Sequence, residues 1–320
     1  MSEAFVPSSA YRRFRGRDFL TLVDYTAEEI QMLLDLAVQL KRRQKEGKPT
    51  PILNGKTLGM IFEKSSTRTR VSFEVGMYQL GGQALFLSTQ DLQLGRGETI
   101  ADTARVLSRY LDGIMIRTFA HEKAVELARF ATIPVINGLT DDYHPCQVMA
   151  DLLTIQEKKG HLKGLKLAYV GDGNNMAHSL MQGGALMGMH VAVATPPGYE
   201  PRQDVLTYAK QLASDAGSEV TATHVPEEAV DGADVVYTDV WTSMGQEQET
   251  QQRLRDFRGY QVDEKLMKRA KPDALFMHCL PAHRGEEVTD EVADGPQSVI
   301  FDQAENRLHA QKAILVALMS

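Results

Sequence analysis

The sequence is poor in cysteine, aromatic residues and long apolar runs, and each shortage excludes a class of protein. Its 320 residues include two cysteines and one tryptophan, and aromatic residues make up 7% of the chain. Cys146 and Cys279 are too few for a disulfide framework, and their separation does not match metal-ligand spacing. No stretch approaches the roughly 18 uninterrupted apolar residues that a membrane span requires. We therefore expect a soluble protein, without membrane contacts, in a reducing cytoplasmic compartment.

The chain also lacks an apolar run near its start and any excess of positive charge. Its first ten residues contain no apolar segment of the kind found in secretory signals. The 42 acidic residues outnumber the 35 basic ones, which gives a formal net charge of −7. That balance argues against a partner such as nucleic acid. A small anionic substrate would therefore need a local cluster of arginines and backbone N–H groups.

What the sequence does contain is a regular alternation of strand and helix patterns. The composition, 43% hydrophobic and 24% charged, suits two globular domains of about 150 residues each. A capping-box sequence at Thr26–Glu29 predicts a first helix, which Gly47 and Pro49 end. Predicted strands then cover Thr57–Phe62, Ala84–Leu87, Gly113–Ile116 and Ile133–Ile136, with helices at Arg68–Leu80, Thr99–Tyr110 and Glu122–Phe130 between them. Such alternation is typical of a parallel sheet covered on both faces.

A second series of the same kind follows a predicted helix around Pro145–Lys159. Its predicted strands are Leu165–Val170, Val191–Ala194, Glu219–Thr223, Val235–Thr238, Ala274–Met277 and Val299–Phe301. Residues Gly245–Gln252 predict an exposed loop or a helix start, and Ala304–Leu318 predict a final helix. We expect an α/β fold of two doubly wound domains, residues 1–150 and 151–320, linked by helices. The last helix, about residues 304–320, is expected to pack on the first domain.

The first strand of the first domain is followed by a string of small hydroxyl residues and arginines. Ser66, Thr67, Arg68 and Thr69 stand where the strand gives way to a helix. Backbone N–H groups at such a turn point outward at the positive end of a helix dipole. The planar guanidinium of Arg68 suits a phosphate group. Taken alone, the string is also consistent with an ordinary Ser/Thr cap beside solvated arginines; the functional interpretation is a phosphate cradle.

Two later strand ends add further polar groups. Arg117 follows the third predicted strand, and His144 precedes a helix that opens at Pro145 and contains Gln147. Proline is well suited to the first helical turn, where its missing N–H costs nothing. His144 by itself is equally consistent with a helix-cap histidine. Because the carboxyl ends of parallel strands form the binding edge of such sheets, the three strand ends together predict a site for a phosphorylated substrate.

A glycine-bearing polar loop, Gln93–Glu98, precedes the third predicted helix of this half. One interpretation is a plain surface loop. The other is a mobile segment that reaches a site, either its own or that of a neighbouring subunit. Both interpretations are compatible with the loop's composition.

Taken together, these motifs resemble the aspartate/ornithine carbamoyltransferase family, over about Arg15–Met319. The string S-T-R-T, the loop Q-x-G-x-x-E, the arginine after the third strand and H-P-x-Q occur in the family's order. The resemblance implies that carbamoyl phosphate is held by Ser66, Thr67, Arg68, Thr69, Arg117, His144 and Gln147. It also implies that Gln93 contributes across the interface of a homotrimer, or of a multiple of trimers, with shared active sites. Cys146 falls at the variable position of H-P-x-Q and is interpreted as a packing residue.

The second half carries four motifs that resemble the ornithine branch of that family. They are Gly171–Met176, Asp239–Gly245, His278–Pro281 and the pair Asn306–Arg307. A Gly-x-Gly turn after a strand can also mark a nicotinamide site. Here the third glycine of that pattern is missing, and no acidic residue clearly ends the next strand. The dinucleotide interpretation therefore fails on spacing.

An amino acid with a second amine requires an anionic acceptor for its α-ammonium and donors for its carboxylate. Asp239 and Asn175 are chemically suited, and Ser243 and the main chain of Met244 lie nearby in the sequence. By resemblance, these four residues bind ornithine. Three further contacts to carbamoyl phosphate are implied in the same way: Cys279, Leu280 and Arg307.

The resemblance implies transfer of the carbamoyl group of carbamoyl phosphate to the side-chain amine of L-ornithine. The products are L-citrulline and phosphate, as in arginine biosynthesis, and no metal or organic cofactor is expected. Arg117, His144, Asp239 and Cys279 are the expected catalytic residues. Two alternatives stay open: a carbamoyltransferase for another amine, such as putrescine or an acylated ornithine, and a non-catalytic regulator that binds a phosphometabolite.

Overall fold

The computed structural model describes residues 8–90, 92 and 97–320, and these divide into two compact units. Unit 1 contains the chain up to Leu153 together with Asn306–Ser320, and unit 2 is Thr154–Glu305. Each unit is built on one sheet in which all strand pairs are parallel. The predicted α/β fold with two central parallel sheets is therefore confirmed. No described helix is long and apolar enough to cross a membrane.

The sheet of unit 1 has four strands in the order β2-β1-β3-β4. The strands are β1 (Thr57–Phe62), β2 (Gln83–Ser88), β3 (Gly113–Arg117) and β4 (Val135–Leu139). After β2 the chain returns past β1 to form β3, so the direction in which strands are added reverses once, between β1 and β3. The N-terminal segment extends the sheet beyond β4, because Phe19 forms a parallel bridge with Ile136.

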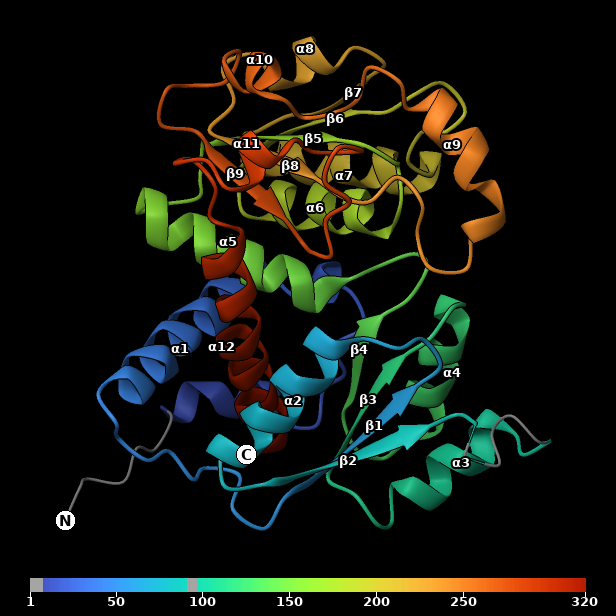
Figure 1. Ribbon diagram of the computed structural model, residues 1–320. Helices are drawn as coiled ribbons and strands as arrows, with labels where there is room; N and C mark the ends of the chain where they lie inside the picture. Colours follow the sequence, from blue (N-terminus) through green and yellow to red (C-terminus); the bar gives the residue numbers. More distant parts are fainter. Residues whose placement is uncertain (1–7, 91, 93–96) are drawn as a thin grey trace. The chain divides into compact units, whose positions relative to one another are not determined.

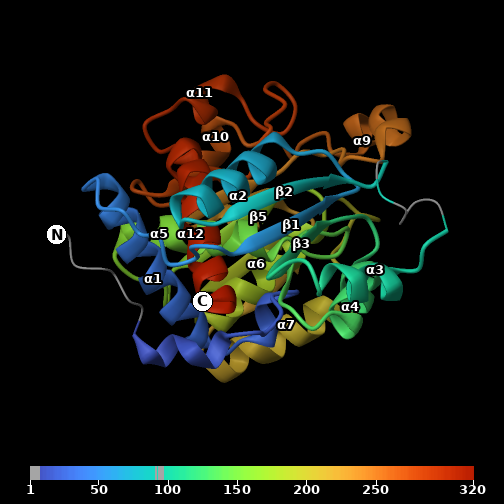
Figure 2. The same ribbon diagram turned by 90° about the horizontal axis from the view of Figure 1, so that it is seen from below.

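Helices cover both faces of this sheet (Figures 1 and 2). They are α1 (Ala27–Lys45), α2 (Thr67–Gln79), α3 (Ile100–Leu107), α4 (His121–Phe130), the start of α5 (Pro145–Lys159) and the end of α12 (Ile300–Met319). One face packs an apolar cluster against α3 and α4, in which Ile114 and Ile116 of β3 meet Leu127. The helix α1 begins at the predicted capping box, where Thr26 and Glu29 exchange side-chain-to-backbone hydrogen bonds.

The sheet of unit 2 has five strands in the order β7-β6-β5-β8-β9. The strands are β5 (Lys166–Val170), β6 (His190–Ala194), β7 (Val220–Thr223), β8 (Val235–Thr238) and β9 (Leu275–His278). Here the chain begins at the centre of the sheet, runs outward to β7, and then returns to add β8 and β9 on the other side of β5. The reversal in this sheet falls between β5 and β8.

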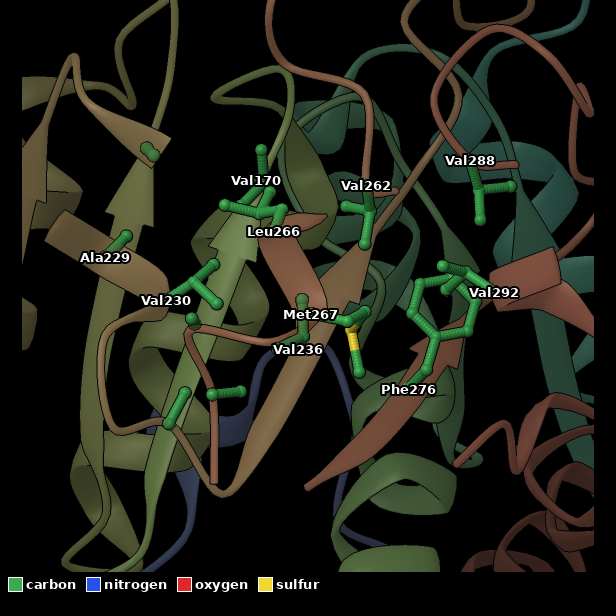
Figure 3. Packing of buried hydrophobic residues seen from close by; sticks show 14 of the residues in the cluster. Val170, Ala229, Val230, Val236, Val262, Leu266, Met267, Phe276, Val288 and Val292 are labelled. Carbon is green, nitrogen blue, oxygen red and sulfur yellow. The ribbon is translucent and has the colours of Figure 1, made fainter. Parts of the chain in front are cut away.

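Alternate residues of these strands supply the two faces of the sheet. One face forms the apolar cluster of Figure 3, in which Val170, Val236 and Phe276 pack against side chains of α8 (Pro226–Val230), α10 (Glu264–Met267) and α11 (Asp290–Ala293). The opposite face is covered by α6 (Asn175–Leu186) and α7 (Gln203–Ala216) (Figure 1). At about 25 cal/mol per Å² of buried apolar surface, this two-sided burial supplies most of the driving force for folding.

Two local predictions need correction. The apolar triplet Val299–Phe301 is not a strand: α12 begins at Ile300, and only Ser298 makes a single bridge to Phe276. Three apolar residues carry too little periodicity to separate a strand from the first turn of a helix. The strand predicted at Ile133–Ile136 is also displaced, since β4 runs from Val135 to Leu139. The predicted helix start within Gly245–Gln252 is confirmed, because a short 3-10 helix (Glu247–Glu249) leads there into α9 (Thr250–Asp256).

A buried lysine lies between three helices of unit 1. Lys312 of α12 is 1% exposed, and its ammonium donates to the amide oxygens of Gln44 on α1 and Gln79 on α2, at 2.7 and 2.9 Å. Both acceptors are neutral, so burial dominates and lowers the pKa of Lys312 to about 8. A lysine whose pKa is lower in the folded chain weakens folding while it is protonated. That penalty is complete below about pH 8 and is lost as pH rises toward the unfolded value of about 10.4.

Replacement of Lys312 by methionine should therefore stabilise the protein at neutral pH. We expect Lys312→Met to raise the free energy of unfolding at pH 7 by about 1 kcal/mol, and the gain to shrink toward pH 10. Urea unfolding of both proteins at the two pH values measures this. The exposed Lys45 of α1 provides a control, since Lys45→Met should change little at either pH. Equal destabilisation by Lys312→Met at both pH values would contradict the explanation.

Candidate functional site

The two reversals of strand order single out two places in the fold. Where strands are added in opposite directions, the loops that follow the two central strands leave on opposite sides and open a crevice. In unit 1 these loops follow β1 and β3, and in unit 2 they follow β5 and β8. The predicted site residues fall on these loops and on the segments beside them.

The loop after β1 forms the N-terminus of α2. Ser66 is the N-cap of this 13-residue helix, and its hydroxyl accepts a hydrogen bond from the N–H of Thr69 at 3.2 Å. Thr67 is exposed and Arg68 is half-buried, so both are accessible to a ligand. The positive end of the helix dipole and the outward-pointing N–H groups make this turn suitable for an anion.

Arg307 of α12 joins two of the predicted residues within unit 1. Its guanidinium donates to the hydroxyl of Thr69 at 3.1 Å and to the side-chain oxygen of Gln147 at 2.8 Å. A third bond, from Nε to Gln311, measures 3.0 Å. Arg307 is 3% exposed and all three acceptors are neutral oxygens. The structure thus brings together residues from positions 69, 147 and 307.

His144 precedes α5 and is also buried. Burial lowers the pKa of its imidazole well below the usual value, and nearby positive charges lower it further. Those charges belong to Arg307, Arg117 and Arg68. With its pKa lowered in this way, His144 is a neutral imidazole at neutral pH, and the three arginines are near enough to act on it.

The position of Arg117 depends on an irregularity in the sheet. Between Ile116 and Arg117 the register of β3 against β4 shifts, and Gly138 is the extra residue. A side chain at Gly138 would place its Cβ 2.4 Å from the sulfur of Met115, so a larger residue there would require the Met115 side chain to move. Bulges of this kind redirect a side chain at the end of a strand.

A charged network that the sequence did not reveal ties the same strand ends together. Glu63, directly after β1, accepts two hydrogen bonds from Lys123 of α4 at 2.7 and 3.0 Å and one from the hydroxyl of Thr118. Although burial raises the pKa of Glu63, these hydrogen bonds lower it below its usual value overall. The N–H of Glu63 donates to the carbonyl of Arg117 at 2.8 Å. The only sign of this network in the sequence was the charged residue Glu63 directly after β1.

One predicted residue of this half-site cannot be placed. Gln93 lies outside the described residues, as do positions 94–96 of the same loop. Its predicted contribution across a subunit interface therefore stays a prediction.

Asp239 is the centre of the polar cluster in unit 2. It directly follows β8 and is 6% exposed. One carboxylate oxygen accepts from the thiol of Cys279 at 3.0 Å and from the N–H of Val240 at 2.8 Å. The other accepts from the side-chain amide of Asn174 at 3.2 Å. The structure thus joins Asp239 and Cys279, predicted from separate motifs, at the ends of the neighbouring strands β8 and β9.

The asparagine bonded to Asp239 is Asn174, the neighbour of the predicted ornithine contact Asn175. Asn174 is the N-cap of α6, and its side-chain oxygen accepts from the N–H groups of Met176 and Ala177. Its amide nitrogen is thereby turned toward Asp239. Asn175 is the first residue of the helix and is half-buried. An asparagine at the boundary between a strand and a helix was the signal for this cap.

Ser243 and Met244 lie on the segment between Asp239 and α9. Ser243 forms a tight turn, since its N–H donates to the side chain of Gln246 and its carbonyl accepts from the N–H of the same residue. Met244 is 45% exposed. Both predicted residues are thus accessible on this segment.

The turn that carries Cys279 and Leu280 is held by a buried pair. His278 ends β9, and its Nε2 lies 3.0 Å from the carboxylate of Glu287, a residue that is fully buried. The Nδ1 of His278 accepts from the N–H of Leu280 at 2.8 Å, so we assign the proton to Nε2. Leu280 has a φ of 59°, a left-handed conformation that costs energy for leucine and persists only where surrounding contacts enforce it. His278 and Glu287 were not predicted as site residues.

Two groups of side chains in the described part of the chain have the donor types of a metal site. They are Asp239, His278 and Cys279, and His283, Glu286 and Glu287, with ligand atoms within 4.8 Å of one another in each group. In the first group, both nitrogens of His278 already take part in hydrogen bonds.

Comparison with known proteins identifies the family of both domains. Residues 17–157 match the carbamoyl-P binding domain of the Aspartate/ornithine carbamoyltransferase family, and residues 163–318 match its Asp/Orn binding domain. The ornithine carbamoyltransferase of Anoxybacillus flavithermus is 66% identical over 307 residues, which cover 96% of this chain and 98% of that protein. The anabolic ornithine carbamoyltransferase of Pyrococcus furiosus is 62% identical over 304 residues, covering 95% and 96%.

Solved structures give the same answer for the fold. Ornithine carbamoyltransferase from Pyrococcus furiosus superimposes with a TM-score of 0.93 at 61% identity, covering 96% of this chain and 98% of that one. The enzyme from Gloeobacter violaceus gives a TM-score of 0.86 at 53% identity, covering 96% and 99%. With both domains matched in order along nearly the whole chain, this protein belongs to the aspartate/ornithine carbamoyltransferase family.

Proposed function

We propose that this chain transfers the carbamoyl group of carbamoyl phosphate to the side-chain amine of L-ornithine, giving L-citrulline and phosphate. The observation that carries the proposal is the buried Arg307, which binds Thr69 at the N-terminus of α2 and Gln147 of α5 within unit 1. Arg307, Arg117 and Arg68 also lower the pKa of His144. Local positive charge of this kind, in a chain whose net charge is −7, supports a site for a multiply charged anion. Formation of citrulline is the step that this activity contributes to arginine biosynthesis.

The phosphate of carbamoyl phosphate occupies the N-terminus of α2 in this proposal. Arg68 and the N–H groups of Ser66–Thr69 hold its oxygens, and Arg307 adds a buried positive charge. Because Arg307 also fixes Thr69 and Gln147, the site is organised before the substrate arrives. Leaving-group phosphate gains charge as its bond to carbon breaks, and these groups stabilise that charge.

The carbamoyl carbonyl is polarised by neutral and charged donors together. A neutral His144 donates one N–H without adding a further positive charge to the arginine cluster, and Arg117 and Thr69 supply the others. As the amine attacks, the carbonyl oxygen becomes an oxyanion, which such donors stabilise by several kcal/mol. Cys279 and Leu280 are proposed additional contacts of the carbamoyl group.

Ornithine binds in unit 2 in this proposal. The buried carboxylate of Asp239 accepts the α-ammonium, while Asn175, Ser243 and the main chain of Met244 bind the carboxylate. The amide of Asn174 holds Asp239 in place, so its orientation does not depend on substrate. An amine that lacks the α-ammonium would leave this buried carboxylate without its cationic partner, which is costly.

The reaction forms a C–N bond and breaks a C–O bond to phosphate. The δ-ammonium of ornithine has no lone pair, so it first loses a proton, and the departing phosphate accepts one later. We propose that Asp239 and Cys279 assist the loss of the proton from the δ-ammonium. Their side chains are in contact, because the thiol donates to the carboxylate at 3.0 Å. Cys279 is not assigned as a covalent nucleophile, because the free amine suffices. The two substrates must meet for transfer, and their orientation supplies much of the acceleration.

We also propose a homotrimer, or a multiple of trimers, that places the loop of Gln93 at the site of a neighbouring subunit. An exposed apolar surface on α2 and the edge strand β2 supports this: Tyr78 is 81% exposed, Val71 49% and Phe86 39%. Exposed apolar residues grouped in this way are typical of a protein contact. Light scattering should give about three times the chain mass of 35.5 kDa, or a multiple of that value, and a mass of 35.5 kDa would contradict the proposal. Cys146 and Cys279 form no disulfide, which is consistent with the cytoplasmic location that we propose.

The function is tested by a panel of acceptors. The carbamoylated product is measured in four separate assays, each with carbamoyl phosphate and one acceptor. The acceptors are ornithine, putrescine, aspartate and N-acetylornithine. Strong turnover with ornithine alone is expected. Turnover with a different amine would keep the anion site and refute the assignment of Asp239. Binding of carbamoyl phosphate without turnover with any acceptor would favour a regulator.

Removal of the half-buried guanidinium at the N-terminus of α2 should weaken phosphate binding. We expect Arg68→Ala to raise the dissociation constant of carbamoyl phosphate by about 10- to 100-fold, the usual effect of losing a charge-assisted hydrogen bond. Calorimetry without the second substrate measures this directly. The exposed Arg70, two residues further along α2, is the matched control, and Arg70→Ala should bind normally. Normal affinity in Arg68→Ala would refute the cradle.

Replacement of the thiol that donates to Asp239 tests the proposed proton path. We expect Cys279→Ser, which keeps a donor but changes its acidity, to lower kcat by about tenfold, at the low end of acid–base effects. Steady-state rates at saturating ornithine measure it. Cys146→Ser, at the buried cysteine outside this cluster, controls for the loss of a thiol. Near-normal turnover in Cys279→Ser would show that the thiol has no role in the transfer.

A further inference from the structure

A buried arginine outside the predicted site connects three loops of unit 2. Arg253 of α9 is 6% exposed. One guanidinium nitrogen, Nη1, donates to the carboxylate of Asp172 at 2.7 Å and to the main-chain carbonyl of Trp241 at 2.9 Å. Its Nε donates to Glu249 at 2.8 Å. The guanidinium carbon lies 5.0 Å from the centre of the Tyr199 ring.

These partners come from the ends of three neighbouring strands. Asp172 belongs to the turn after β5, Tyr199 to the loop after β6, and Trp241 to the segment after β8. The first two loops are themselves in close contact: the N–H of Gly173 donates to the carbonyl of Tyr199 at 2.9 Å. A Cβ at Gly173 would lie 2.3 Å from the nitrogen of Pro201, so this contact leaves no room for a side chain. The loops after β5 and β6 therefore form a fixed base.

Arg253 attaches the segment after β8 to that base. The segment Asp239–Glu249 begins with Asp239 and carries Ser243 and Met244 at its middle. Arg253 contacts it at two points, Trp241 and Glu249, which lie on either side of those two residues. Because Asp172 is buried as well, the ion pair between Arg253 and Asp172 is largely shielded from water. A lysine could not replace this arrangement, since one ammonium does not match the planar fork.

We propose that Arg253 is a positioning residue for the amino-acid substrate: it holds the segment Asp239–Glu249 against the loops after β5 and β6 and thereby sets the affinity for ornithine. The inference rests on the proposed function, because Ser243 and Met244 are proposed ornithine contacts. Arg253 acts through the main chain of Trp241 and through Asp172, and not by contact with substrate. Its effect falls on ornithine rather than on carbamoyl phosphate, whose proposed anion cluster lies in unit 1.

The chain contains its own reporter for this segment. Trp241 is the single tryptophan, it is 6% exposed, and its ring stacks on Phe257 at 5.6 Å between centroids. Intrinsic fluorescence therefore reports on the one residue whose carbonyl Arg253 holds. A change in emission on loss of the guanidinium shows displacement of the segment in the absence of any substrate.

The test compares Arg253→Ala, Arg253→Lys and Asp172→Asn with the wild type. We expect Arg253→Ala to raise the KM for ornithine by about 10- to 100-fold, as small misplacements of substrate contacts do, with the KM for carbamoyl phosphate changed less than about twofold. Its Trp241 emission should shift, and millimolar guanidinium chloride, but not sodium chloride, should partly restore ornithine KM. Arg253→Lys should be intermediate. Arg255→Met, at an exposed arginine of the same helix, should match the wild type.

The outcomes separate this inference from the proposed function. If the wild type does not use ornithine, the proposed function fails. If the wild type uses ornithine but Arg253→Ala keeps its ornithine KM and Trp241 emission, the positioning role is overturned. Equal increases in the KM for both substrates would also overturn it, because they indicate general damage to the fold. If Arg253→Ala does not fold, Asp172→Asn decides, with the same expected selective increase in ornithine KM at smaller size.

Discussion

The single reversal of strand order in each sheet is the constraint on which the rest of this structure depends. In a parallel sheet every strand end and every helix start lies at one edge, and the reversal opens a gap between two loops at that edge. In unit 1 the gap lies between the ends of β1 and β3, and in unit 2 between the ends of β5 and β8. Arg117 lies at the end of β3 and Asp239 directly follows β8, so in both units a proposed catalytic residue lies at the point where strand order reverses.

Neutral groups bind the charged side chains that lie at these gaps. In unit 1 three acceptors of Arg307 are the hydroxyl of Thr69 and the amide oxygens of Gln147 and Gln311. In unit 2 the carboxylate of Asp239 accepts hydrogen bonds from an amide, a thiol and a backbone N–H, none of which carries positive charge. Burial of a charge is costly, and these hydrogen bonds offset part of that cost.

Further contacts hold the strand ends of both units in position. Glu63 and Lys123 join the strand ends near Arg117, and the buried pair of His278 and Glu287 shapes the turn of Cys279. Glu63 and Lys123 escaped prediction because they are 60 positions apart in the sequence. His278 and Glu287 are only nine positions apart, but no helix or strand period relates them. Local patterns report periodicity and caps, whereas a pairing of this kind exists only after the strands have been placed. The strand prediction for Val299–Phe301 was wrong for a different reason, because a short apolar run does not distinguish a strand from a helix.

What the sequence by itself determined is the alternating α/β architecture, the two parallel sheets and the chemical character of the strand ends. Hydrophobic periodicity and helix caps are local properties, so they can be predicted from neighbouring residues. What only the tertiary structure decided is which polar groups touch: Arg307 with Thr69 and Gln147, Asn174 with Asp239, and Arg253 with Asp172. These contacts depend on strand order and on helix packing, which bring together residues separated by 65 to 238 positions, as no local pattern can specify.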